Sequence, residues 1–466
     1  MRTTKKPEEI DRKVPSKGIR FKGPLFVFFL ALLMVTSWPC LKCANAHDAH
    51  VDINTCVKIA LKNNLKILKK ELQKQAQTYH SNAVFKEMLP SFGTDYSYTG
   101  RRDAATIVIF GRSTTIYGHD EYKWNLNVKQ PIFYGGLLWN RYKEARIDVD
   151  LAGLALFQVK NEIIKETKTA FYQVLKNKKL LEEAKAQLKR LRAQYETVKA
   201  FYKASLKPKT DLLQSQVQLN QGRLSLLKAK HQYELSKNRL NLVMKRSLEA
   251  PVIIEEEVHL PEMDISLEKL YMEALKNRPE VIQAHLAIKR AQRDVKIAMS
   301  EFFPRVDLTA SYSKDGVTPD VSDNPYGDHE NAQIFLNATW ELFSWGKSRD
   351  KVVAAQKKME AARVALQDVS DHVTLEVKNA YLLYKDAKES VVVARSALES
   401  AREDYELNVS RYKNQLASNT DVLDAQSRLT KARSDFISAV ATELTAIANI
   451  EYAVGREIEK CTQKRK

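Results

Sequence analysis

Four segments of the chain alternate apolar and polar residues with a period of two, the pattern of strands that present one apolar face. We predict strands at about residues 91–100, 122–134, 305–313 and 332–344. The predicted apolar faces consist of Phe92, Thr94, Tyr96, Tyr98, Trp124, Leu126, Val128, Ile132, Val306, Leu308, Ala310, Tyr312, Ile334, Leu336, Ala338, Trp340 and Leu342. Such faces are typical of lipid-facing barrel strands. A soluble sheet covered by helices is the alternative, because each segment alone carries a weak signal.

Polar stretches join the strands of each pair at residues 100–121 and 314–330, where we expect surface loops. A long run without proline follows each second strand, and its apolar residues recur in alternating steps of three and four. About 70 residues rising 1.5 Å each form a helix of about 105 Å, longer than an ordinary globular domain holds. Each run ends at a short polar turn, beyond which a return helix begins. The sequence therefore predicts two helical hairpins, at about 136–248 and 346–455.

The predicted elements occur twice along the chain. Ala60-Leu-Lys-Asn63 returns 214 residues later as Ala274-Leu-Lys-Asn277, and Thr210-Asp211 returns 210 residues later as Thr420-Asp421, where Thr and Asp suit an N-cap and a first helical turn. The chain is thus two copies of a helix–strand–strand–long helix–helix unit. We divide it into a first repeat at 47–250, an inter-repeat segment at 251–268, a second repeat at 269–460 and a basic tail at 461–466.

The first 46 residues have the features of a secretory signal peptide. A basic segment precedes eleven apolar residues at 25–35, and a small-residue motif follows at Ala44-Asn45-Ala46. We expect cleavage there, with an uncleaved membrane anchor as the alternative. Cys56 and Cys461 remain near the two ends of the exported chain. In an oxidising compartment they either pair or stay as buried thiols, and the sequence leaves both possibilities open.

Composition excludes several classes of protein. The chain has 75 Lys and Arg against 57 Asp and Glu, a formal charge of +18, which raises the question of nucleic-acid binding. The basic residues are interspersed with Glu and Gln, as on a solvated coiled-coil face, so we expect no nucleic-acid partner. We find no catalytic, phosphate-binding or metal-ligand motif, and we expect no enzyme activity, no cofactor and no metal site.

Four strands cannot close a barrel, and an open sheet edge in lipid leaves backbone groups unsatisfied at several kcal/mol each. Several chains must therefore combine their strands. Three chains supply twelve, a number within the known range of transmembrane barrels. Their helical hairpins would extend the barrel as a hollow cylinder. The predicted fold is mainly α with a membrane β-barrel, and the predicted activity is conduction.

The chain resembles the TolC-like outer-membrane efflux protein family over nearly all of its exported length. The features that carry the resemblance are the duplication, Ala60 and Ala274, Pro90 and Pro304, and Thr420-Asp-Val-Leu-Asp-Ala425. The resemblance implies a homotrimer with a 12-stranded β-barrel in outer-membrane lipid and a long periplasmic α-helical barrel. It also implies an equatorial region that includes the inter-repeat segment. The expected function is a passive exit duct of a tripartite efflux or type I secretion system in a Gram-negative bacterium, working with a periplasmic adaptor and an inner-membrane transporter.

In that family the periplasmic tip is closed at rest by inward-coiled helices with rings of acidic residues. Asp421, Asp424, Asp211 and Tyr412 match this pattern and are the expected entrance residues. Asp421 and Asp424 lie three residues apart at the start of a helix, so a trimer would carry two stacked negative rings. The alternative is that Asp421 only favours the helix N-terminus.

The resemblance also implies that the hairpin tips dock the adaptor. The expected docking residues are Ser205, Lys207, Lys209, Thr210, Ser418, Asn419 and Thr420. A different function is a periplasmic coiled-coil adaptor, which has helical hairpins but needs no lipid-facing strands. The two possibilities therefore differ in the role of the sheet.

Overall fold

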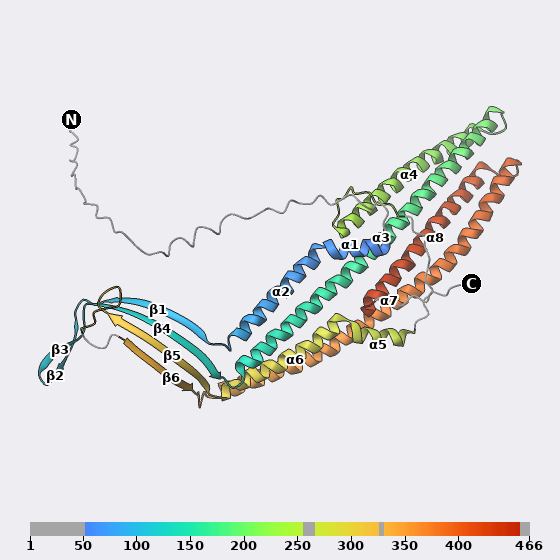
Figure 1. Cartoon of the computed structure of the whole chain (residues 1–466). Helices are drawn as coiled ribbons and strands as arrows, with labels where there is room; N and C mark the ends of the chain where they lie inside the picture. Colours follow the sequence, from blue (N-terminus) through green and yellow to red (C-terminus); the bar gives the residue numbers. More distant parts are fainter. Residues whose placement is uncertain (1–51, 255–265, 326–329, 457–466) are drawn as a thin grey trace, which may run out of the picture. The chain divides into compact units, whose positions relative to one another are not determined.

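The computed structural model describes residues 52–254, 266–325 and 330–456. The predicted signal peptide, the tail 461–466, Cys461 and most of the inter-repeat segment lie outside these residues. Cys56 is described and fully buried, and its pairing with Cys461 stays a prediction. The helices and strands follow one another in two successive sets along the chain (Figure 1).

The first set contains α1 (Ile53–Asn63), α2 (Leu65–Lys86), β1 (Ser91–Gly100), β2 (Ala105–Ile109), β3 (Arg112–Tyr117), β4 (Asp120–Phe133), α3 (Leu137–Lys203) and α4 (Lys209–Met244). The second set contains α5 (Leu267–Asn277), α6 (Pro279–Met299), the 3-10 turn Ser300–Phe302, β5 (Arg305–Gly316), β6 (Glu330–Thr339), α7 (Lys347–Lys413) and α8 (Asn419–Val454). Both α3 and α7 have 67 residues, and both α4 and α8 have 36. The equal lengths agree with a duplicated unit, and each long helix extends about 100 Å.

The single helix expected before each strand pair is two helices in the structure. Asn64 interrupts the first with extended backbone, and its side-chain oxygen caps α2 by accepting a hydrogen bond from the Lys66 amide at 2.9 Å. Arg278 interrupts the second, because the ring of Pro279 disfavours helical backbone in the residue before it. The prediction of one continuous helix was therefore wrong at equivalent positions in the two repeats.

The four main strands form one antiparallel sheet in the order β1-β4-β5-β6. The register aligns the residues of the predicted apolar face: Phe92 lies opposite Val128, Val128 opposite Ala310, and Ala310 opposite Ile334. The predicted alternation is thus confirmed as one common apolar face along most of the four strands. It was wrong at two places: Trp340 and Leu342 lie beyond β6, which ends at Thr339, and a register shift between Pro131 and Phe133 places Phe133 instead of Ile132 opposite Val306. Phe92 and Ile334 are 76% and 75% exposed, so this face is uncovered in the single chain. The opposite face carries Gly93, Asn127, Ser311 and Gln333 in the next row.

The stretch between β1 and β4, expected to be a polar loop, contains the hairpin β2–β3. Its turn places Phe110 and Gly111 at φ values of +51° and +78°, as a tight two-residue hairpin turn requires. The short run Thr-Ile-Val-Ile at residues 106–109 was the strand signal that the polar composition of the stretch concealed.

Each long helix begins directly after the sheet. Gly136 precedes α3 and Gly346 precedes α7, with φ values of +83° and +82°. Glycine adopts this left-handed conformation without the steric cost that other residues incur. The two glycines therefore direct the chain from strand to helix in the same way in both repeats.

The helices pack in the same order on both sides of a middle zone. Next to the sheet, α2 packs on α3, α3 on α6, and α6 on α7. In the other half, α4 packs on α3, α3 on α8, and α8 on α7. The short helices α1 and α5 pack where the halves meet, α1 against α3 and α4 and α5 against α7 and α8. The outer members of the second half are α4 and α7 (Figure 1).

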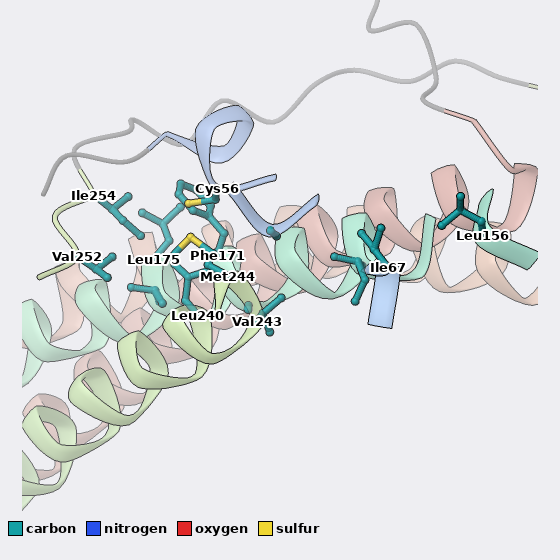
Figure 2. Packing of buried hydrophobic residues seen from close by; sticks show 14 residues of the cluster. Cys56, Ile67, Leu156, Phe171, Leu175, Leu240, Val243, Met244, Val252 and Ile254 are labelled. Atoms are coloured by element: carbon teal, nitrogen blue, oxygen red, sulfur yellow. The ribbon is translucent and has the colours of Figure 1, made fainter. Parts of the chain in front are cut away.

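An apolar core fills the junction of α1, α3 and α4 (Figure 2). Phe171 and Leu240 are almost completely buried in it, with Cys56, Met244 and Ile254 around them. A second core joins α5, α7 and α8 in the other repeat. Each fully buried side chain of this size contributes about 1.5–3 kcal/mol. The middle zone is therefore where the two repeats gain much of their packing energy.

We predict that Phe171→Ala lowers the free energy of unfolding by about 3–5 kcal/mol, because it opens a cavity in this core. Phe157→Ala on the same helix is the matched control, since Phe157 is 43% exposed. Urea unfolding of the purified protein in nonionic detergent, followed by circular dichroism at 222 nm, measures both changes. Equal losses for the two variants would contradict the assignment of Phe171 to the core.

Candidate functional site at the hairpin tips

The two hairpins end in turns of the same geometry. After α3, Ser205 takes φ of +56° and the Leu206 amide donates to the Phe201 carbonyl at 2.9 Å. After α7, Gln415 takes φ of +61° and the Leu416 amide donates to the Arg411 carbonyl at 2.7 Å. A residue in the left-handed conformation and a bond back across the last turn are a common helix ending. The repeat thus extends to the conformation of the tips.

The return helices start one residue earlier than predicted, so Thr210 and Thr420 lie inside them. Ser418 is the N-cap of α8: its hydroxyl accepts from the Asp421 amide at 3.1 Å, and the Asp421 carboxylate accepts from the Ser418 amide at 2.8 Å. This reciprocal capping box lowers the pKa of Asp421, with a smaller contribution from Arg411 and Arg428. Asp421 therefore stabilises the N-terminus of α8, which was the alternative role considered for it from the sequence.

Most of the predicted tip residues are accessible. Asp421 and Asp424 are exposed, as are Ser205, Lys209, Thr210, Ser418 and Thr420, while Lys207 and Asp211 are half-buried. Asp421 and Asp424 stand three residues apart in the first turns of α8. Two carboxylates of each chain thus face water at this end of the second hairpin.

Asn419 differs from its neighbours because it is buried and joins the two tips. Its side-chain oxygen accepts from Gln194 of α3 at 3.1 Å and from Ser215 of α4 at 3.2 Å. Its amide nitrogen donates to the Asp211 carbonyl at 3.3 Å. One side chain of α8 therefore bonds to both helices of the first hairpin. These bonds occupy the side chain that the sequence analysis assigned to adaptor docking.

Tyr412 is also buried between the tips, at 1% exposure. Its ring lies 5.8 Å from that of Phe201, and the Lys207 ammonium stands 5.3 Å from its centroid. Burial raises the pKa of Tyr412 to about 12, and the negative charge of Asp211 adds to the rise. Tyr412 is thus a neutral side chain that packs the second hairpin against the first, and Lys207 bridges the tips by a cation–π contact.

A polar seam continues from the tips along α3 and α8, and the sequence analysis did not identify it. Glu183 of α3 accepts hydrogen bonds from Arg190 and from Arg433 of α8, the latter at 2.9 Å. Gln426 of α8 donates to the Gln187 carbonyl at 3.5 Å. Glu183 and Gln426 are buried. They lie among Glu, Gln and Arg residues typical of exposed helices, so their burial follows only from how the hairpins pack.

The described residues contain no group of three or more His, Cys, Asp or Glu side chains placed to hold a metal ion. In the same part of the chain, no helix has the length and apolar character needed to cross a membrane.

Comparison with known proteins relates the whole arrangement to one family. The family model described as outer membrane efflux protein matches residues 56–244 and 270–456, one stretch in each repeat. The alkaline protease secretion protein AprF of Pseudomonas aeruginosa is 23% identical over 346 residues, which cover 72% of this chain and 70% of that protein. The outer membrane protein TolC of Salmonella enteritidis is 21% identical over 411 residues, or 84% and 79% of the two chains. The crystal structure of the CmeC outer membrane channel of Campylobacter jejuni matches with a TM-score of 0.75 at 18% identity, covering 88% of this chain and 86% of that one.

We predict that Asn419→Ala loosens the contact between the tips. The change removes three hydrogen bonds and leaves buried partners unsatisfied, a cost of about 1–3 kcal/mol. Amide hydrogen exchange of peptides covering residues 194–215 and 415–430 should then speed up about 5- to 150-fold. Asn414→Ala is the control, because Asn414 is exposed at the same tip and bonds only to the Ser410 carbonyl within α7. Unchanged exchange in the Asn419 variant would remove this residue from the link.

Proposed function

The chain belongs to the outer membrane efflux protein family, and from this premise we propose that three copies form a passive exit duct. The duct crosses the outer membrane as a 12-stranded β-barrel and continues into the periplasm as a barrel of helices. It conducts substrate outward and catalyses no reaction. The observation that carries the proposal is the sheet, which has one apolar face, one polar face and two free edges.

The two free edges of the sheet have directions that allow them to pair between neighbouring copies. Neighbouring strands in the sheet are antiparallel, so β6 runs opposite to β1. The β6 strand of one copy can therefore form an antiparallel pair with the β1 strand of the next copy. Three copies then close a ring in which every strand has two neighbours. In lipid each unpaired backbone group costs several kcal/mol, and closure removes this cost. The apolar face then meets lipid and the polar face lines water.

Aromatic residues lie at both ends of the apolar face. One group at the loop end contains Tyr96, Tyr98, Tyr122, Trp124 and Tyr312. Phe133, Phe303 and Trp340 lie where the sheet meets the helices. From Tyr122 to Phe133 the strand rises about 37 Å, or about 28 Å at a barrel tilt of about 40°. The spacing suits two aromatic girdles around a hydrocarbon core of about 25–30 Å.

The outer members of the helical layer are also suited to join copies. α4 exposes Leu213, Val217, Leu224, Leu227 and Leu235 along one side, and α7 exposes Val392, Val393 and Leu407. Between α7 and α8 lies a groove with Ala394, Ala397, Ala401, Ala432 and Ala439 in its lining, together with charged side chains that include Asp386, Glu389, Arg428, Lys431 and Asp435. Small residues admit a neighbouring helix closely. We assign the α4–α7 contact between copies to the wall of the periplasmic barrel.

A relative named for alkaline protease secretion and a family described as outer membrane efflux protein support the role in efflux or secretion. We assign the exposed tip residues to an adaptor, which connects the duct to an inner-membrane transporter. The transporter selects the cargo. A periplasmic adaptor role for this chain, the other possibility, leaves the exposed apolar face of the sheet without a purpose.

The two faces of the sheet provide a direct test of the duct. We expect the expressed protein in outer-membrane extracts as a heat-labile trimer that forms channels in planar bilayers. Ile334→Lys puts a charge on the lipid face of β6, at a cost of about 2–4 kcal/mol near the bilayer centre, and should abolish the trimer. Gln333→Lys, one residue away on the polar face, should preserve it. Normal trimer with both variants, or a wild-type protein recovered only as a soluble periplasmic species, would refute the duct.

The carboxylates at the second tip supply a separate prediction for the entrance. In a trimer, Asp421 and Asp424 form two negative rings that attract multivalent cations. Asp421→Asn with Asp424→Asn should raise the concentration of a trivalent cation needed for half-block on the order of tenfold. Ser418→Ala is the control, because it breaks the capping box and retains both carboxylates. Identical block in the double variant and the wild type would place the entrance charge elsewhere.

A further inference from the structure

A groove of about 270 Å³ lies between α3 and α8 in the periplasmic half and is bordered by α7. Its apolar lining comes from Leu175 of α3 and from Phe436, Ile437, Val440 and Leu444 of α8. Phe436, Ile437 and Val440 are only half-buried, so apolar surface remains accessible there. The volume is near the lower end for small-molecule sites, which are mostly apolar with a few polar groups.

The charged groups at this groove are all cationic, and the hydroxyl of Tyr172 is the other polar side-chain group in its lining. Lys176 and Lys179 of α3 and Arg395 of α7 line it, and no carboxylate does. Lys179 forms an exposed pair with Glu182 at 3.2 Å. Lys176 and Arg395 have no carboxylate within 4.0 Å among the described residues. The groove therefore joins apolar surface to an excess of positive charge.

A buried acid that is adjacent in sequence to a lining residue forms no ion pair with these cations in the described part of the chain. Glu443 of α8 lies beside the lining residue Leu444 and is 4% exposed. Burial raises the pKa of its carboxyl, and the positive charges of Lys388 and Arg395 partly offset that rise. Glu443 forms no ion pair within 4.0 Å in the part of the chain that the structure describes. Lys176 is thus available to bind a ligand carboxylate or sulfonate. Arg395 is available as well, because it forms no ion pair with Glu443 within 4.0 Å.

The groove lies mainly on the inner helices of the helical layer. In the duct proposed above, on which this step rests, copies join through α4 and α7, whereas every lining residue of the groove except Arg395 of α7 belongs to α3 or α8. All of its lining residues belong to three long helices. The groove is therefore formed within one copy and does not require a contact between copies.

We propose that this groove binds an amphipathic organic anion, with the apolar body against Phe436, Ile437 and Val440 and the acidic group between Lys176 and Arg395. The ligand class is a small carboxylate or sulfonate with an aromatic or short alkyl body. Apolar burial supplies the affinity, and the cations supply the preference for an anion.

The test uses two probes of nearly the same shape and different charge. The full-length protein in lipid nanodiscs is titrated with 1-anilinonaphthalene-8-sulfonate, an anion, and with the neutral N-phenyl-1-naphthylamine, and the signal of empty nanodiscs is subtracted. We expect saturable binding of the anion at one site per chain, at least tenfold tighter than that of the neutral probe. Lys176→Gln with Lys179→Gln should weaken the anion on the order of tenfold and leave the neutral probe unchanged.

Two further variants locate the site. Val440→Trp fills the groove and should abolish saturable binding of the anion. Lys228→Gln with Lys230→Gln removes two exposed lysines from α4, outside the groove, and should preserve binding. The Lys176 and Lys179 variant alters only the groove margin, so it remains informative if the tryptophan variant does not fold. Three outcomes would each overturn the proposal. The first is equal anion affinity in the two lysine variants, and the second is equal affinity of the wild type for the two probes. The third is saturable anion binding by a folded Val440→Trp variant.

Discussion

The backbone N–H and C=O groups along the free edges of β1 and β6 are the constraint on which the rest of this molecule depends. An exposed apolar face places the sheet in lipid, where water cannot satisfy those groups. In the proposed duct, pairing with further copies satisfies them, and the antiparallel order of the strands makes this pairing possible at both edges at once. Each chain must therefore also carry one segment of any wall that continues from the barrel.

The duplication explains why the segments of such a wall have equal lengths. The long helices α3 and α7 have the same length, as do the return helices α4 and α8, and the chain enters both long helices through a glycine of nearly identical conformation. Pairing of β4 with β5 holds the two repeats in one sheet, and the β4–β5 register continues over most of both strands. In the proposed trimer, two repeats in each copy would give six hairpins of equal helix length, as a closed cylinder requires.

The sequence predicted what depends on local periodicity and could not predict what depends on packing between distant segments. Period-two alternation identified the four main strands, and the register confirms their common apolar face. The break at Asn64 was not predicted, because an asparagine within a helical pattern does not by itself mark the end of a helix. The burial of Asn419 and Tyr412 was not predicted either, because it requires the first hairpin to lie against the second. Both look like ordinary tip residues in the sequence.

The two ends of the contact between the hairpins differ in the kind of interaction that holds them. Near the middle zone the apolar cores lie within each repeat, with Phe171 in the first and Ile450 in the second, and the hairpins meet there through the buried ion pair of Lys168 with Glu451 at 2.7 Å. Toward the tips the hairpins are joined by the hydrogen bonds of Glu183 and Asn419 and by a small apolar cluster of Val198, Tyr412 and Val422. Two buried atoms of this seam, Arg190 Nε and Gln426 Oε1, have no hydrogen-bond partner among the described residues. Water can replace the hydrogen bonds of the seam and satisfy the two unpaired atoms, but it cannot compensate for apolar surface that separation of the tips exposes around Tyr412. The apolar core of each repeat would keep its packing if the tips separated, because neither core spans the two hairpins. The main apolar cost of opening a tip is therefore confined to the small cluster around Tyr412.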